Sequence, residues 1–303
     1  MADHHHESAG HDKPAFLAAL AVTLIYAVVE LAGGLWSGSL ALVSDAGHMF
    51  SDAVALGLAA IAVWLARRPP GVRHSYGWAR AEVIGASLNG LIMLGVIVVL
   101  VVEAVARLLD PRPVLGSGVM LIAFIGLLVN GVVAYMLGSG EHNLNTRAAL
   151  IHVVSDLIGS LAALTAGAVI YFTGWLPIDP ILSLVIAGLI LVSTLRLLRD
   201  AVHVLMEGVP AAVDLQHIGQ ALAQVSGVPA VHDLHVWSIT SGQIALSAHL
   251  EIDDLAAWPR ILADAREVMR ARFGIDHVTL QPEPRSTTGA HTSVVRLWPR
   301  GRP

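Results

Sequence analysis

The sequence predicts an α-helical membrane protein with six transmembrane helices, followed by a small α+β domain with the order α-β-β-α-β. The first observation behind this prediction is composition. The 303 residues are 55% hydrophobic and only 14% charged, with a mean hydropathy of +0.68, whereas ordinary soluble domains are far more polar. The second is that six apolar stretches reach the length of about 20 residues that a helix needs to cross a hydrocarbon core about 30 Å thick.

The six predicted helices follow one another through short connections. The first is too long for a secretory leader and has no basic run before it, so we expect it to be retained as a transmembrane helix. The predicted helices cover Phe16–Trp36, Leu40–Ala66, Glu82–Leu108, Val114–Gly138, Ala148–Phe172 and Pro180–Leu198.

Arginine residues are distributed unevenly between the predicted helices. Because basic residues favour the cytoplasmic side of a membrane, we expect both termini to lie in the cytoplasm. Arg107 and Arg112 fall in an opposite loop, so the asymmetry is incomplete. The arginines on the predicted cytoplasmic side are Arg67, Arg68, Arg73, Arg80, Arg147, Arg196 and Arg199.

The pattern changes after Gly208, where shorter elements replace the long apolar stretches. Helical periodicity covers residues 214–225 and 258–273, and alternating patterns predict strands over 230–239, 243–252 and 277–283. We therefore expect a cytoplasmic α+β domain with its helices on one face of a short sheet. The predicted organisation is a His-rich cytoplasmic arm (1–13), a transmembrane domain (14–208), the α+β domain (209–284) and a disordered, basic tail (285–303).

Two histidine–aspartate pairs lie inside predicted transmembrane helices. "VSDAGHMFSD" contains His48 and Asp52, and "HVVSD" contains His152 and Asp156. Residues four apart project from the same face of a helix. At about 1.5 Å per residue, the first pair lies about 16 Å below the outer boundary and the second about 12 Å above the inner one. The two pairs are therefore expected to meet near the midplane.

Two imidazoles and two carboxylates form a set of four ligands that suits the tetrahedral preference of zinc. The chain has no cysteine, so any metal must be held by nitrogen and oxygen atoms. Calcium and magnesium are disfavoured because they require six or more oxygen ligands. Two aspartates are neutralised either by one divalent cation or by two protons on the histidines, which predicts exchange of zinc for protons.

Other polar residues also fall within predicted transmembrane helices. Asp45 lies one turn before His48 and is a candidate pathway or auxiliary residue. We expect Glu30 and Asn130 to support packing or hydration of the path, and Glu103 to pair with Arg107 at a spacing of four.

Several linked motifs carry a family resemblance. The segments "ELAGGLWSGSLALVSDAGHMFSDAVAL", "HSYGWARAEVIGA", "NLNTRAALIHVVSDLIGS" and "VHDLHVWSI" through "HVTLQPE" resemble the cation diffusion facilitators, in particular their zinc-transporting branch, from about Tyr26 to Glu283. The resemblance implies a homodimeric six-span exporter that exchanges cytoplasmic zinc for protons, with a metallochaperone-like cytoplasmic domain. Its transport site falls on the residues His48, Asp52, His152 and Asp156. A histidine at position 48 resembles the zinc-selective version, with cadmium as an alternative metal.

The resemblance also implies a zinc site in the cytoplasmic domain, formed by His232, His249 and Glu283 with a further ligand near Asp276 or His277. His232 and His235 are three apart in a strand, so we expect them to face opposite sides and not to share a metal unless the strand bends. Gln281 stands where some relatives have a second-metal histidine. Whether the site holds one metal or two therefore stays open.

Other functional classes fit the sequence less well. An intramembrane metalloenzyme would need an open coordination position and a general base, but no HExxH motif or nucleophile constellation is present. A channel is disfavoured because tightly ligated metal leaves slowly. The remaining alternative is a membrane metal sensor or scaffold with a structural zinc site. Zinc, protons, the lipid bilayer and a second copy of the chain are the expected partners, with no nucleic acid or organic cofactor, and a bacterial inner membrane is the expected location.

Overall fold

The structure is a computed structural model that describes residues 12–66, 68–138, 144–240, 242–285 and 298–299. Within these elements, the side chains of residues 12–20, 136–138, 144–149, 151–152 and 298–299 lie outside the described part. The His-rich arm at 1–13 falls almost entirely outside it. Contacts divide the chain into two compact units, Met1–Leu58 with Leu88–Leu198 and Ala59–Ser87 with Arg199–Pro303.

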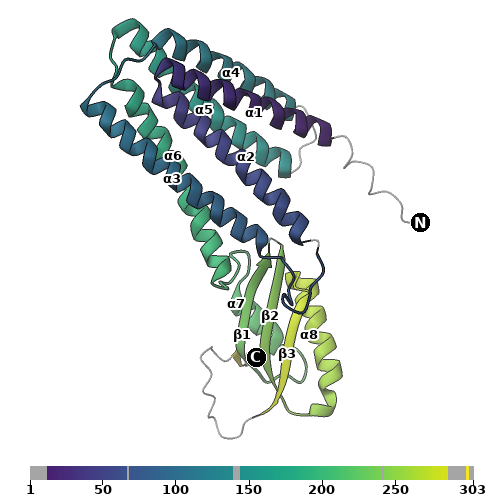
Figure 1. The fold of residues 1–303 in the computed structure, drawn as a ribbon. Helices are drawn as coiled ribbons and strands as arrows, with labels where there is room; N and C mark the ends of the chain where they lie inside the picture. Colours follow the sequence, from purple (N-terminus) through teal and green to yellow (C-terminus); the bar gives the residue numbers. More distant parts are fainter. Residues whose placement is uncertain (1–11, 67, 139–143, 241, 286–297, 300–303) are drawn as a thin grey trace. The chain divides into compact units, whose positions relative to one another are not determined.

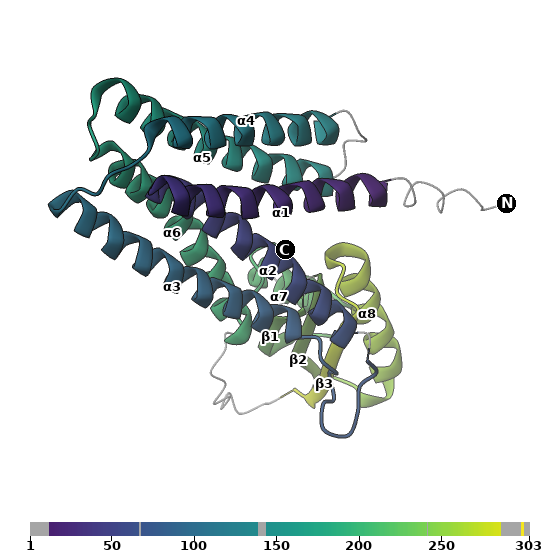
Figure 2. The same ribbon diagram turned by 45° about the horizontal axis from the view of Figure 1, so that its top comes forward.

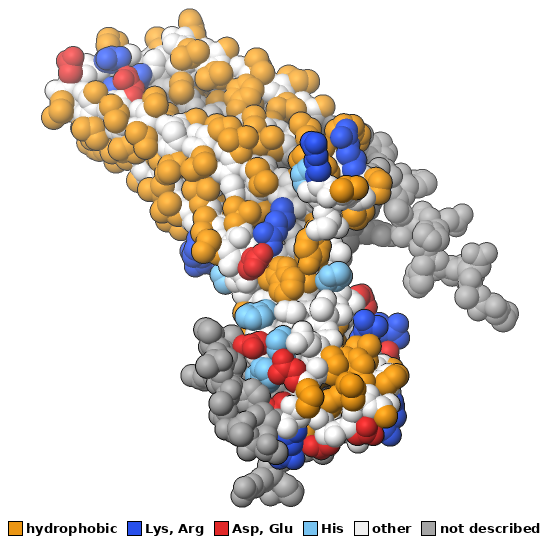
Figure 3. Space-filling view, turned by 60° about the horizontal axis from the view of Figure 1, so that its bottom comes forward, with side chains coloured by type: hydrophobic (Ala, Val, Ile, Leu, Met, Phe, Trp, Pro, Cys, Tyr) orange, Lys and Arg blue, Asp and Glu red, His pale blue; other side chains and the backbone are white. Residues whose placement is uncertain are grey.

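Six long helices make up the apolar part of the chain (Figure 1). They are α1 (Asp12–Ser37), α2 (Leu40–Ala66), α3 (Ala81–Leu109), α4 (Gly116–Gly138), α5 (Leu144–Thr173) and α6 (Ile178–Leu205). Over the described residues, α2 to α6 are each long and apolar enough to span a membrane, while α1 contributes the shorter apolar segment Ala21–Ser37. Hydrophobic side chains cover much of the surface of these helices (Figure 3). The chain is therefore a multi-pass helical membrane protein.

The first unit holds its helices together through close backbone approaches as well as apolar clusters. α4 runs beside α5 (Figure 2), and a Cβ atom on Gly116 would lie 2.9 Å from the carbonyl oxygen of Gly167. A cluster that includes Leu42, Val119 and Ala163 joins α2, α4 and α5. Since a side chain at either glycine would separate α4 from α5, these glycines set the distance between the two helices.

The turn between α1 and α2 requires glycine at position 38. Gly38 has a φ of +73°, a conformation that residues with a Cβ rarely adopt. An added Cβ would also lie 2.8 Å from the carbonyl oxygen of Pro113. Both the backbone angle and the space therefore select glycine where α2 begins.

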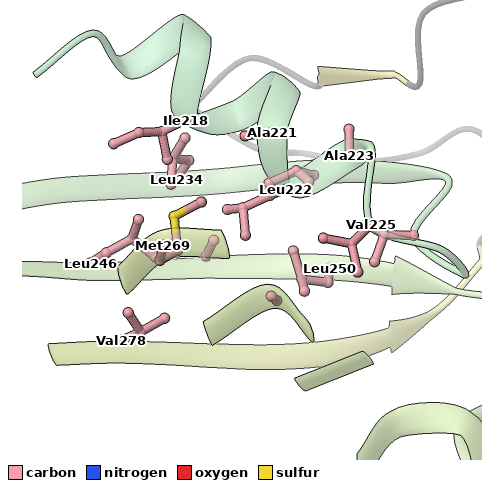
Figure 4. Packing of buried hydrophobic residues seen from close by; sticks show 14 of the residues in the cluster. Ile218, Ala221, Leu222, Ala223, Val225, Leu234, Leu246, Leu250, Met269 and Val278 are labelled. Atoms are coloured by element: carbon pink, nitrogen blue, oxygen red, sulfur yellow. The ribbon is translucent and has the colours of Figure 1, made fainter. Parts of the chain in front are cut away.

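The C-terminal domain has the predicted α-β-β-α-β order. Its elements are α7 (Leu215–Ala223), β1 (Ala230–Thr240), β2 (Gln243–Ile252), α8 (Trp258–Phe273) and β3 (His277–Pro284), with a short 3-10 turn, η2 (Leu255–Ala257), before α8. The sheet order is β3-β2-β1-β4, with β1 antiparallel and β3 parallel to β2. Both helices pack on one face of the sheet, where Leu222, Leu234, Leu250 and Met269 meet in the core (Figure 4).

The segment 285–303 was expected to be disordered, but two of its residues form a strand. Trp298 and Pro299 make β4, which pairs with Val231 and Ala230 of β1. The edge of β1 can accept this partner because the rest of the sheet lies on its other side. The flanking residues 286–297 and 300–303 lie outside the described part.

Candidate functional site

The first predicted ligand pair lies on one face of α2. The Nδ1 atom of His48 is 3.6 Å from Oδ2 of Asp52, and both side chains are partly buried. This contact follows directly from the spacing of four residues in a helix.

The opposite wall of this site is α5, and Asp45 shows where the two helices face each other. The carboxylate of Asp45 packs against Gly159, so that a Cβ there would lie 2.3 Å from Oδ1. One turn further along α2 is His48, and one turn back along α5 is Asp156. Because the helices run antiparallel, both steps lead in the same direction, so His48 and Asp156 lie at the same level.

Asp156 is 1% exposed and faces the interior of the first unit. His152 lies one turn closer to the start of α5 than Asp156, at the level of Asp52, but its side chain is outside the described part. Among described side chains, His48, Asp52 and Asp156 do not bring three ligand atoms within 4.8 Å of one another. The backbone thus places the four predicted ligands on facing helices, and their closure around one ion remains a prediction.

Asp45 is a buried acidic residue of α2. It is 2% exposed and enclosed between helices. Nearby, the hydroxyl of Tyr26 donates to Glu30 Oε1 and to the carbonyl oxygen of Ile122, each at 3.2 Å. A polar layer therefore extends from the candidate site toward α1 and α4.

Two further contacts match the roles expected for polar residues in the helices. The amide of Asn130 on α4 donates to Ser160 Oγ on α5 at 3.4 Å, which agrees with a packing role. Arg107 Nε donates to Glu103 Oε1 at 2.9 Å, so the expected pair at a spacing of four is present.

The C-terminal domain contains a second cluster of metal-ligand types. His232, His249 and Glu283 place one ligand atom each within 4.8 Å of one another, the only such trio among the described residues. Glu283 lies between the two imidazoles, with Oε2 at 3.0 Å from His232 Nε2 and Oε1 at 2.8 Å from His249 Nδ1. The two rings meet edge to face with their centroids 5.2 Å apart.

A bulge in β1 brings Asp233 into this cluster, which the sequence did not suggest. Asp233 has a φ of +46°, and its Oδ2 lies 3.3 Å from His232 Nδ1 and 3.9 Å from His249 Nδ1. The pairing register shifts between His232 and His235. The extra residue of a bulge displaces the alternation of side chains, and this displacement moves Asp233 beside the histidines.

The same bulge corrects the expectation that His232 and His235 face opposite sides of the strand. His232 pairs with His249 and His235 pairs with Ser247. Residues directly opposite in an antiparallel pair share a face, and so do residues two apart in a regular strand. His232 and His235 therefore share a face, although His232 is buried and His235 is exposed.

The last strand supplies a supporting group. Gln281 Nε2 donates to Glu283 Oε1 at 3.3 Å. Neither Asp276 nor His277 joins the described trio, and the His277 ring instead meets Tyr76 edge to face at 5.8 Å.

The donor set of this cluster fits zinc. Two imidazole nitrogens and carboxylate oxygens are ligands that zinc accepts in tetrahedral sites. The two negative charges of the Glu283 and Asp233 carboxylates would balance the charge of one divalent cation. Supporting hydrogen bonds such as that from Gln281 orient metal ligands and raise affinity.

Comparison with known proteins covers nearly the whole folded chain. Residues 16–206 match the family model for the cation efflux transmembrane domain, and residues 210–285 match the model for the cytoplasmic domain of cation efflux proteins. A protein of Bacillus subtilis (strain 168), named cadmium, cobalt and zinc/H(+)-K(+) antiporter, is 38% identical over 288 residues, which is 92% of this chain and 91% of that protein. The zinc transporter ZitB of Escherichia coli (strain K12) is 39% identical over 270 residues, 88% of this chain and 86% of its own length.

Two further relatives come from one organism. The metal cation efflux system protein CzcD of Cupriavidus metallidurans is 36% identical over 285 residues, covering 93% of this chain and 90% of that protein. The solved metal-bound C-terminal domain of the CzcD transporter is 34% identical and covers 23% of this chain and 99% of the solved chain, with a TM-score of 0.22. Because the transmembrane model matches 16–206 and the relatives align over most of both chains, the chain belongs to the cation efflux family of membrane transporters.

Proposed function

We propose that this protein is a secondary transporter that exports zinc from the cytoplasm in exchange for protons, with cadmium as a second substrate. The observation that supports the proposal is the contact between Asp45 of α2 and Gly159 of α5, one turn from the His48–Asp52 pair on α2 and one turn from Asp156 on α5. In our proposal, His48 faces Asp156 and Asp52 faces His152. Relatives of this chain are named as transporters of zinc and as an antiporter of cadmium, cobalt and zinc with H(+) and K(+). We assign the transport site to His48, Asp52, His152 and Asp156.

The chemistry of these four ligands supports proton exchange. A divalent ion between two aspartates leaves no net charge, and the same holds when each histidine carries a proton. In a low-dielectric interior, an unbalanced pair of carboxylates would be costly. Metal ligands must also lose protons before they bind, so zinc release on one side and proton uptake there are linked.

Alternating access follows from the closed nature of such a site. Four protein ligands leave no open coordination position for rapid passage. The ligands must therefore separate before the metal can leave, and ligands on two different helices can separate when those helices move. This requirement distinguishes the proposal from a channel.

The cytoplasmic domain holds a resident zinc ion in this proposal. His232, His249 and Glu283 would bind it, with Asp233 as the fourth group, and the ion would crosslink β1, β2 and β3. Gln281, at the position where some relatives have a histidine for a second metal, donates a hydrogen bond to Glu283 instead. This favours one metal ion over two. We further propose that the protein is a homodimer of the bacterial inner membrane with both termini in the cytoplasm.

Reconstituted protein tests the proposal directly. Liposomes that contain a zinc-sensitive dye should show saturable zinc uptake that depends on an imposed pH gradient. Asp52→Ala and Asp156→Ala should abolish uptake. Ser44→Ala is a matched control because Ser44 is buried in α2 and bonds only within its own helix, to the carbonyl oxygen of Leu40.

The alternative function, a membrane metal sensor or scaffold, predicts a different result. A structural zinc site would bind one ion per chain and show no uptake at any pH gradient. Zinc binding without transport would therefore favour the sensor, whereas uptake that ignores the gradient would refute proton exchange. Competition among zinc, cadmium, manganese and iron would define the metal range.

A further inference from the structure

The first turn of α2 is capped by a carboxylate from another helix. Asp179, in the first turn of α6, is completely buried. Its Oδ2 accepts from the backbone N–H of Leu40 at 2.7 Å, and its Oδ1 accepts from Ser39 Oγ at 2.5 Å and from the N–H of Ala41 at 3.3 Å. One side chain of α6 thus accepts hydrogen bonds from the buried donors where α2 begins, which have no partner within that helix.

This contact is both strong and directional. The first N–H groups of a helix have no partner within the helix, and the positive end of the helix dipole favours an anion there. Hydrogen bonds to an ionised carboxylate are roughly twice as strong as those between neutral groups. Because Leu40 and Ala41 both donate to one carboxylate, the contact fixes the height of α2 and its rotation about its own axis.

The neighbouring residues are tied to two further helices. Arg107 of α3 donates to the carbonyl oxygen of Gly38, and the N–H of Leu115 donates to the carbonyl oxygen of Ser37 at 2.8 Å. The turn that leads into α2 is therefore connected to α3 and to the start of α4, and the first turn of α2 is connected through Asp179 to α6.

The burial of side chains within the protein differs along α2. Leu40, Ala41 and Leu42 are almost completely buried, whereas Val54 is 44% and Leu56 is 43% exposed. His48 and Asp52 lie between these two regions. The capped first turn of α2 and the contact of Asp45 with Gly159 therefore act together to position them.

We propose that Asp179 is a positioning residue for the transport site. It acts through α2, because His48 lies eight residues beyond Leu40, about 12 Å along a continuous helix. A shift of one residue in the cap would rotate α2 by about 100° and move it by about 1.5 Å, enough to turn His48 and Asp52 away from α5. This inference rests on the proposed transport function.

Three variants test it in the reconstituted full-length protein. Asp179→Ala removes all three bonds, and Asp179→Asn keeps one acceptor oxygen. Ser39→Ala keeps the carboxylate but removes two bonds, the one that Ser39 donates to Asp179 and the one that it accepts from the N–H of Leu42 at 3.3 Å. Ser193→Ala is the matched control, since Ser193 lies on the same helix, 14 residues from Asp179, and donates to the carbonyl oxygen of Ile190 at 2.8 Å. Zinc uptake is measured over a range of zinc concentrations, with the amount of folded protein determined by size-exclusion chromatography and thermal unfolding.

A positioning role predicts a rise in the KM for zinc. Asp179→Ala should raise KM about tenfold, the lower end of the effect of removing groups that orient metal ligands. Asp179→Asn and Ser39→Ala should give smaller rises in that order, and Ser193→Ala none. A purely structural role would instead lower Vmax and the yield of folded protein while KM stays unchanged in all variants, and that result would overturn the inference.

The two proposals fail in different ways. If the wild-type protein shows no zinc uptake, the proposed function is wrong. If the wild-type protein transports zinc and Ser39→Ala and Asp179→Asn fold with the wild-type KM, only the positioning role of Asp179 is refuted.

Discussion

Replacing Gly159 with alanine puts a methyl group into the contact between α5 and α2. The added Cβ would lie 2.3 Å from Oδ1, 2.7 Å from Cγ and 2.8 Å from Oδ2 of Asp45. Favourable contact between such atoms needs about 3.5 Å, so the carboxylate must retreat by about 1 Å. Asp45 is enclosed by protein, and its retreat therefore moves α2 or forces the side chain into another rotamer.

The expected effect on stability is moderate and the effect on zinc binding is larger. Overpacking costs about 1–3 kcal/mol, while alanine gains about 1 kcal/mol over glycine within a helix. These contributions partly cancel, so the unfolding temperature should fall only slightly. His48 lies one turn from Asp45, and a displacement of about 1 Å at a metal ligand should raise the KM for zinc about tenfold.

Zinc uptake by reconstituted protein measures this effect, with thermal unfolding of the same samples. Gly188→Ala on α6 and Gly57→Ala on α2 serve as controls, because an added Cβ at either position would meet nothing within 4 Å. Both controls should keep the wild-type KM. A Gly159→Ala protein with wild-type KM would refute the idea that α2 and α5 face each other at Asp45, and with it the assigned level of His48 and Asp156.

Two further substitutions address other parts of the structure. Gln281→Ala should weaken zinc binding by the cytoplasmic domain about tenfold, since it removes the hydrogen bond that orients Glu283. Calorimetric titration of the full-length protein measures this affinity. An unchanged affinity would contradict the supporting role of Gln281. Gly38→Ala should destabilise the protein by about 1–3 kcal/mol, because it places a Cβ at a positive φ and 2.8 Å from the carbonyl oxygen of Pro113. Thermal unfolding, with Gly188→Ala as the control, measures this loss. An unfolding temperature equal to that of the control would show that the turn tolerates alanine.

The arrangement of the elements could be predicted well because it depends on local patterns. The predicted helix at 258–273 has the observed bounds, and the predicted strands agree with β1, β2 and β3 to within one residue at each end. Length and hydropathy suffice for the long helices, since a membrane imposes a minimum length. Helix ends were less accurate: α6 continues to Leu205 because no proline or glycine stops it at Leu198.

The contacts within the candidate sites were less predictable from local sequence patterns. The His48–Asp52 contact follows from helical spacing alone. Asp233 could not be assigned, because a one-residue bulge in β1 brings it to the histidines and nothing in the alternating pattern announces that bulge. Asp179 precedes a proline at a helix start, which suggests a cap for its own helix, but its partners are the N–H groups of α2, about 140 residues away. Contacts between distant segments depend on packing that the local sequence does not encode.

The two proposed zinc sites should respond differently to pH because their surroundings differ. Asp156 is almost completely buried among apolar helices, so departure of a cation must be matched by arrival of protons. The side chains of His249 and Glu283 are 33% and 28% exposed, so water and dissolved ions can compensate charge there. At both sites protons compete with zinc for the imidazole nitrogens, so zinc binding weakens as the pH falls. Only the membrane site, however, should convert a pH difference between the two compartments into directed zinc movement. Reversing the imposed gradient in liposomes should therefore reverse net zinc flux in the wild-type protein and in Glu283→Ala alike, and loss of this reversal in Glu283→Ala would place proton coupling in the cytoplasmic domain.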